Sequence, residues 1–247
     1  MSKRILTAMV TLLFVASAGV TSAQLAYPGI DTLESDPFNG GKWSRVNTQG
    51  NADWSSAQAL SGNNSIYLMR TAGGFAEDPR AWIEFSGVPQ TGRVQVSWWM
   101  YATGNHGGNF TISGHFGTTT TQTGGDLALC EIAYASGPQE IFIYDGAWTG
   151  TGQLLGDHAN VWTSHRVVFD QDARNFDYYF DPGTGEVALR TNNALLPGGA
   201  KLGDGSHDNF MSEPSTGGTE WYIDSVYIGP EVTPAWVPVE LSDFVVE

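Results

Sequence analysis

The stretch Trp221-Tyr222-Ile223-Asp224-Ser225-Val226-Tyr227-Ile228-Gly229 decides the fold, because its aromatic and β-branched residues are typical of a buried strand. One acid, Asp224, interrupts this apolar run. Burying a charged side chain costs free energy unless the charge finds a partner. We therefore expect residues 221–229 to form an inner strand of a sheet and Asp224 to have a specific partner.

The rest of the chain predicts further short strands separated by turns. It contains 31 Gly, 9 Trp, 9 Tyr and 12 Phe residues, and no amphipathic helical pattern is visible after the first residues. This composition favours an all-β domain. The strands that we predict are 65–70, 81–86, 93–101, 110–116, 127–135, 140–145, 165–170, 176–180 and 220–228. Polar, glycine-rich stretches at 117–125 and 196–218 are predicted to be long surface loops, and residues 170–175 a hairpin turn.

The strand at 93–101 alternates between two kinds of face. One face carries the apolar residues Val94, Val96, Trp98 and Met100, and the other carries Gln95, Ser97, Trp99 and Tyr101. Two interpretations of Trp99 are open: contact with a covering loop, or a platform on which a sugar ring stacks. Under the second interpretation, the platform residues are Trp99, Tyr101 and Trp148.

The N-terminus has the pattern of a secretory signal over residues 1–23. Lys3 and Arg4 precede an apolar run at 5–18, which is too short to span a bilayer, and small residues follow up to Ala23. We expect an exported protein at the cell surface or outside the cell. Without the signal, 9 basic residues remain against 26 acidic ones, and the formal charge moves from -15 to -17. So acidic a surface is a poor partner for nucleic acid.

Four stretches of the mature chain resemble the concanavalin-like lectin and glucanase superfamily, in particular its laminin-G-like branch. They are the opening Asp-Pro-Phe-Asn-Gly-Gly-Lys-Trp at 36–43, the segment at 59–68, the strand pair at 162–181 and the closing strand at 221–228. The resemblance implies a two-sheet antiparallel β-sandwich, or jelly roll, over residues 24–229. Galactose-binding-like modules share the closing strand, so the topology within the sandwich class is open. Residues 230–247 are expected to be a linker and a C-terminal strand that begins a second domain or pairs with another copy.

The same resemblance implies a structural calcium ion where the first and last strands meet. Glu34, Asp36 and Asp224 take the matching positions, and carboxylate oxygens suit this ion. The alternative is that Asp224 accepts hydrogen bonds from the backbone or from Lys42.

A catalytic function has little support in the sequence. Retaining glucanases of the resembled superfamily carry the acids Glu-x-Asp-x-x-Glu on one strand, and this chain has no such set. The remaining candidates are Glu131 as a general acid or base and His115, with Tyr101 or Tyr134, for lyase chemistry.

Three hypotheses of function follow. The leading one is a secreted, non-catalytic domain that binds a glycan or cell-surface polysaccharide, or acts in adhesion. The alternatives are a glycoside hydrolase or lyase that uses Glu131 and His115, and a matrix or filament subunit that associates through its C-terminal strand.

Overall fold

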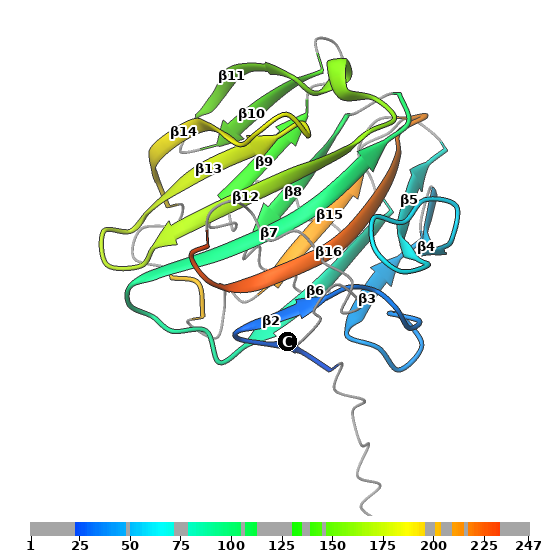
Figure 1. Ribbon diagram of the computed structural model, residues 1–247, viewed down its shortest axis with the longest axis horizontal. Helices are drawn as coiled ribbons and strands as arrows, with labels where there is room; N and C mark the ends of the chain where they lie inside the picture. The colour runs from blue at the N-terminus through cyan, green and yellow to red at the C-terminus, as the bar shows by residue number, and fades with distance from the viewer. Residues whose placement is uncertain are drawn as a thin grey trace, which may run out of the picture.

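The computed structural model shows two β-sheets packed face to face (Figure 1). The residues that it describes are 23–47, 50–71, 79–104, 107–112, 130–134, 139–144, 147–195, 201–203, 209–214 and 217–232. No helix in this part of the chain is long and apolar enough to cross a membrane. A short 3-10 helix, η1 (Leu155–His158), follows β11.

The front sheet of Figure 1 carries the closing strand at its centre. Its order is β14 (Val187–Ala194), β13 (Asn175–Asp181), β12 (Trp162–Asp170), β7 (Arg93–Ala102), β16 (Glu220–Pro230), β5 (Ser65–Arg70) and β4 (Gly50–Ser55), with β2 (Gly29–Asp31) also paired to β16. All of these pairs are antiparallel.

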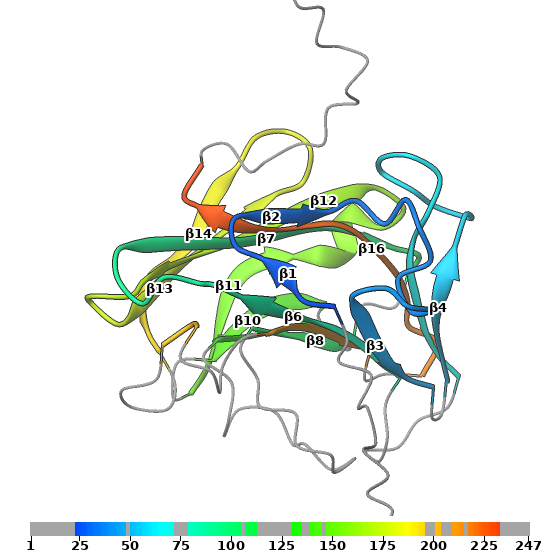
Figure 2. The ribbon, with the colours of Figure 1, turned by 90° about the horizontal axis from the view of Figure 1, so that it is seen from below.

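The back sheet lies behind the front sheet in Figure 1 and below it in Figure 2. Its order is β1 (Leu25–Ala26), β6 (Arg80–Ser86), β15 (Asn209–Pro214), β8 (Gly108–Ile112), β9 (Cys130–Tyr134), β10 (Glu140–Tyr144) and β11 (Trp148–Leu154), with β3 (Trp43–Val46) also paired to β6. The pair of β1 and β6 is parallel, and the others are antiparallel.

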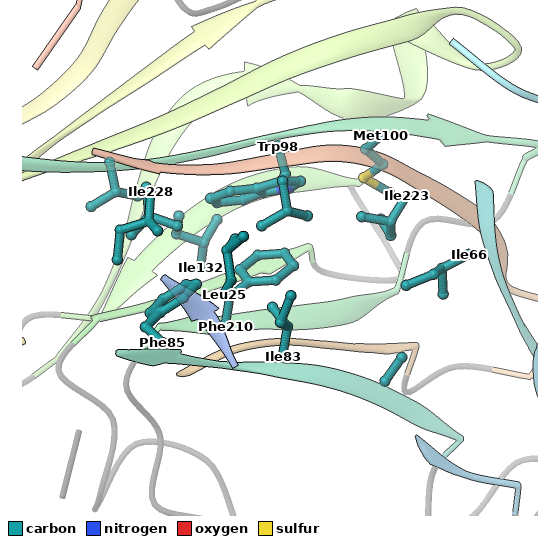
Figure 3. Close-up of a cluster of buried hydrophobic side chains, with 14 of the residues drawn as sticks. Leu25, Ile66, Ile83, Phe85, Trp98, Met100, Ile132, Phe210, Ile223 and Ile228 are labelled. Carbon is teal, nitrogen blue, oxygen red and sulfur yellow. The ribbon is translucent and has the colours of Figure 1, made fainter. Parts of the chain in front are cut away.

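The core fills the space between the two sheets (Figure 3). Trp98 of the front sheet packs against Phe210 of the back sheet, with ring centroids 4.9 Å apart. Trp43 meets the same Phe210 ring edge-on at 6.2 Å. Both sheets contribute further side chains labelled in Figure 3, which include Ile66, Met100 and Ile223 from the front and Ile83 and Ile132 from the back. The large aromatic rings thus hold the two layers together, because they bury the most apolar area per residue.

The structure confirms the predicted all-β, two-sheet sandwich. The alternation in β7 is also confirmed, since Val94, Val96, Trp98 and Met100 are all buried in the core. The hairpin at 170–175 is present, with the Asp170 carboxylate accepting hydrogen bonds from the backbone N–H groups of residues 172 and 173.

One predicted loop contains a strand. The polar stretch at 196–218 includes β15, which lies inside the back sheet between β6 and β8. Its Phe210 is fully buried. The neighbouring Asn, Ser, Glu and Pro residues give the segment no clear apolar alternation, so the sequence does not predict a strand there. The predicted signal at 1–23 and C-terminal segment at 230–247 lie almost entirely outside the described residues.

His165 is a buried polar residue within this core. Its ring stacks on Trp98, its Nε2 lies 3.0 Å from Thr163 Oγ1 and its Nδ1 lies 2.9 Å from the Tyr178 hydroxyl oxygen. Because the Thr163 hydroxyl donates to the Met100 carbonyl oxygen, we assign the proton to Nε2, and the Tyr178 hydroxyl then donates to Nδ1. Burial lowers the pKa of His165 to about 3.

This burial predicts acid-sensitive stability. Below pH 6.5 His165 is protonated in the unfolded chain but stays neutral in the folded chain. The free energy of unfolding therefore falls as the pH drops. His165→Gln keeps a donor and an acceptor at this position. Between pH 7.5 and pH 4.5 we expect its free energy of unfolding to fall by about 2–3 kcal/mol less than that of the parent chain. Urea unfolding at several pH values measures this difference. Equal pH dependence of the two chains would contradict it.

Candidate functional site

Four aromatic side chains form a row across the outer face of the front sheet. They are Tyr67 of β5, Tyr222 of β16, Tyr101 of β7 and Trp162 of β12, and each is the register partner of the next. Ring centroids are 5.0 Å apart from Tyr67 to Tyr222, 5.9 Å from Tyr222 to Tyr101 and 5.6 Å from Tyr101 to Trp162. We call these four residues the aromatic row.

Strand alternation places the row on the outside. The neighbours Ile66 and Ile223 point into the core, so Tyr67 and Tyr222 point away from it. Tyr222 is mostly covered by its neighbours, whereas the other three rings of the row are partly exposed. The row therefore presents several aromatic edges and faces on one side of the sandwich.

Carboxylates border the row. Glu220 accepts hydrogen bonds from the Tyr222 hydroxyl at 3.1 Å and from Thr103 Oγ1 at 2.8 Å. Burial, followed by the nearby Glu220 charge, raises the pKa of Tyr67 to about 12 and raises the pKa of Tyr222 as well. Both phenols therefore stay neutral hydrogen-bond donors at physiological pH. At the end of the row, Asp53 is the register partner of Tyr67.

The predicted platform of Trp99, Tyr101 and Trp148 is divided between two faces. Trp99 lies two residues from Tyr101 on β7, beside the aromatic row and on the same face. Trp148 belongs to β11 of the back sheet, where it packs on Tyr144 with ring centroids 5.0 Å apart and is 46% exposed. The structure thus brings Trp99 and Tyr101 together and leaves Trp148 on the opposite side of the sandwich.

Sequence reasoning missed three members of the row. Tyr67 and Tyr222 lie at outward positions of two predicted strands. Trp162 lies at an outward position just before the predicted strand 165–170. Their alignment depends on strand order and register, which no single strand's sequence states.

Asp224 finds its partners in the protein. It is fully buried, and its carboxylate accepts hydrogen bonds from the backbone N–H groups of Leu60 at 2.9 Å and Ser61 at 3.3 Å and from Ser225 Oγ at 3.1 Å. Burial raises the pKa of Asp224 to about 6, although these hydrogen bonds act in the opposite direction. Lys42, the other partner considered, lies 3.8 Å from Asp31.

The two other predicted calcium ligands lie in the chain that leads to β3. The Asp36 carboxylate accepts hydrogen bonds from the backbone N–H groups of Phe38 and Asn39. Glu34 packs against Gly62, where a Cβ atom would collide with its carboxylate. Among the described residues, no three acidic, histidine or cysteine side chains gather as a metal site would require. The Asp224 carboxylate is already satisfied by hydrogen bonds within the protein. Calcium bound jointly by Glu34, Asp36 and Asp224 stays a prediction.

The predicted catalytic pair falls largely outside what the structure describes. Glu131 lies in β9, where its register partners are Thr111 and Tyr144, and its side chain is not among the described parts. His115 lies outside the described residues.

No protein-family model matches the sequence, and no curated protein matches it either. Solved structures do share the fold. The catalytic domain of the glycoside hydrolase family 131 protein from Coprinopsis cinerea is 12% identical, with a TM-score of 0.55, and the match covers 90% of this chain and 100% of that chain. The carbohydrate esterase of Shiga toxin-encoding bacteriophage phi24B is 16% identical (TM-score 0.49, 81% and 98% covered), and the lectin-like defense protein arcelin-5 from Phaseolus vulgaris is 9% identical (TM-score 0.48, 78% and 94% covered).

The fold that the sequence resemblance implied is therefore confirmed. The chain is a two-sheet β-sandwich of the jelly-roll type, and it shares this fold with the Coprinopsis cinerea domain.

The contacts of Asp224 predict a difference between two substitutions. Asp224→Ala leaves the N–H groups of Leu60 and Ser61 without an acceptor, and we expect the free energy of unfolding to fall by about 2–4 kcal/mol. Asp224→Asn keeps an acceptor oxygen and should lose less than half as much. Urea unfolding in the presence of EGTA measures both.

Equal losses in the two variants would contradict this account of Asp224. The same experiment bears on the metal prediction. A melting temperature of the parent chain that falls when EGTA is added, and recovers with calcium, would support an ion at the chain ends.

Proposed function

We propose that this protein is an exported, non-catalytic carbohydrate-binding domain whose ligand is a neutral glycan. The observation that carries the proposal is the aromatic row, in which four rings follow one another at 5.0–5.9 Å across neighbouring strands. Sugar rings present C–H groups that pack on aromatic faces, and their hydroxyl groups need hydrogen-bond partners beside those faces. The row supplies the aromatic faces, and Glu220 with the neutral tyrosine hydroxyls supplies the hydrogen-bond partners.

Charge supports a neutral ligand. The formal charge of the chain is -15, which disfavours a polyanionic polysaccharide. The arginines on the same face of the front sheet are held in ion pairs. Arg93 binds Glu231 at 2.6 Å and Asp177 at 3.1 Å, and Arg166 pairs with Glu186.

Two rival functions lead to different measurements. A glycoside hydrolase or lyase that uses Glu131 and His115 would release reducing ends or unsaturated products from a polymer that it binds. A matrix or filament subunit would self-associate, for which size-exclusion chromatography across a wide concentration range is the test.

Native gels that contain a soluble neutral polysaccharide test the proposal. With laminarin, xyloglucan and galactomannan as probes, we expect at least one polymer to retard the folded chain without releasing reducing ends. Each ring of the row contributes about 1 kcal/mol, so Tyr101→Ala and Trp162→Ala should each weaken retardation about fivefold. Alginate, a polyanion, should have no effect.

Trp148→Ala is the matched control. It also removes a large exposed aromatic ring, but from the back sheet, and should leave retardation unchanged. Absence of retardation by all three neutral polymers, or equal weakening by Trp148→Ala, would overturn the proposal.

A further inference from the structure

A groove of about 710 Å³ opens beside β3 at the edge of the back sheet. It was not among the sites that the sequence predicts. The residues that line it include Asp36, Phe38, Asn39, Ser44, Arg45 and Trp82. They come from the turn before β3, from β3 itself and from β6, so three neighbouring segments of the chain shape one space.

Hydrogen bonds fix the wall of the groove. Oδ1 of Asp36 accepts from the backbone N–H groups of Phe38 at 2.9 Å and Asn39 at 3.1 Å, and the Trp43 N–H donates to the Pro37 carbonyl at 2.9 Å. These contacts hold the turn against the start of β3. The groove is therefore formed before any ligand arrives, which lowers the entropic cost of binding.

Arg45 lines the groove beside Phe38. Its guanidinium lies 4.5 Å from the centre of the Phe38 ring, and its Nη1 donates to the Ala52 carbonyl at 2.9 Å and to Asp53 Oδ1 at 2.6 Å. The arginine charge is thus matched by Asp53. Trp82, the register partner of Ser44, is partly exposed and contributes a second aromatic ring.

Three polar groups of the groove are available to a ligand. Within the described part of the chain, Oδ2 of Asp36, the side-chain amide of Asn39 and the hydroxyl of Ser44 make no hydrogen bond. The first is an acceptor, and the other two both donate and accept. Acceptors and donors set beside aromatic rings suit the vicinal hydroxyl groups and apolar face of a sugar.

We propose that this groove binds one neutral pyranose unit of a glycan; this inference rests on the proposed carbohydrate-binding function. A uronic acid is disfavoured because its carboxylate would meet Asp36, while the charge of Arg45 is already paired with Asp53.

The groove adjoins the aromatic row. Asp53, which binds Arg45 of the groove, is the register partner of Tyr67 at the end of the row. The ion pair between Arg45 and Asp53 thus links the wall of the groove to the end of the row. The row thus offers a surface for a stretch of polymer, and the groove offers a separate site for one sugar unit.

Saturation-transfer difference NMR on the folded full chain tests the groove separately from the row. The probes are methyl β-glucoside, methyl β-galactoside, methyl α-mannoside and methyl β-glucuronide. We expect at least one neutral glycoside to bind and the glucuronide to bind at least tenfold more weakly than that glycoside. Asn39→Ala and Asp36→Asn should each weaken binding of the neutral glycoside about tenfold, since the first removes a hydrogen-bonding amide and the second replaces the acceptor Oδ2 with a donor NH2 group. Asp36→Asn keeps the oxygen that caps the turn.

Trp148→Ala is the control, because it removes an exposed ring at the opposite edge of the back sheet and should leave binding of the monosaccharide unchanged. The inference is overturned if none of the neutral glycosides binds, if both groove variants bind like the parent chain, or if the glucuronide binds as well as the neutral sugars. If only the groove proposal is wrong, polysaccharides still retard the chain, and this retardation still depends on Tyr101 and Trp162. If the proposed function is wrong, no neutral polysaccharide retards the chain.

Discussion

The structure depends on the placement of β16 at the centre of the front sheet. One edge of this strand pairs with β7 along almost its whole length, and the other edge is shared by β5 in the first half and β2 in the second. At the change of partner, Ser225 has a φ of 53° and the register with β7 shifts. The Asp224 carboxylate stabilises this irregular point, because it gives the N–H groups of Leu60 and Ser61 an acceptor in a place that water does not reach.

The same strand arrangement creates the aromatic surface. Because β5, β16, β7 and β12 are neighbours in the sheet, single aromatic residues that are far apart in the sequence become adjacent. Cross-strand contacts of this kind stabilise the sheet as well as exposing rings on it. A residue of the row can therefore serve both stability and recognition.

Charge divides the outer face of the front sheet into two regions. The aromatic row occupies one, and a network of ion pairs centred on Arg93 and Arg166 occupies the other. The Arg166 guanidinium also lies 3.8 Å from the centre of the Tyr179 ring, which leaves this arginine almost completely buried. The network includes Glu231, so it also fixes the end of β16 and the chain that follows it. Paired in this way, these cations are poorly placed to attract an anionic polymer.

The sequence by itself determined the fold class, the strands with clear alternation and the need of Asp224 for a partner, because these follow from local periodicity and from the cost of burying a charge. It also singled out Trp99 and Tyr101. Only the tertiary structure decided that Trp148 lies on the opposite sheet, that β15 forms within a polar stretch and that Tyr67, Tyr222 and Trp162 join Tyr101. The physical reason is that strand order and register arise from long-range pairing and packing, and a single strand's sequence specifies which face is buried but not which strand will lie beside it.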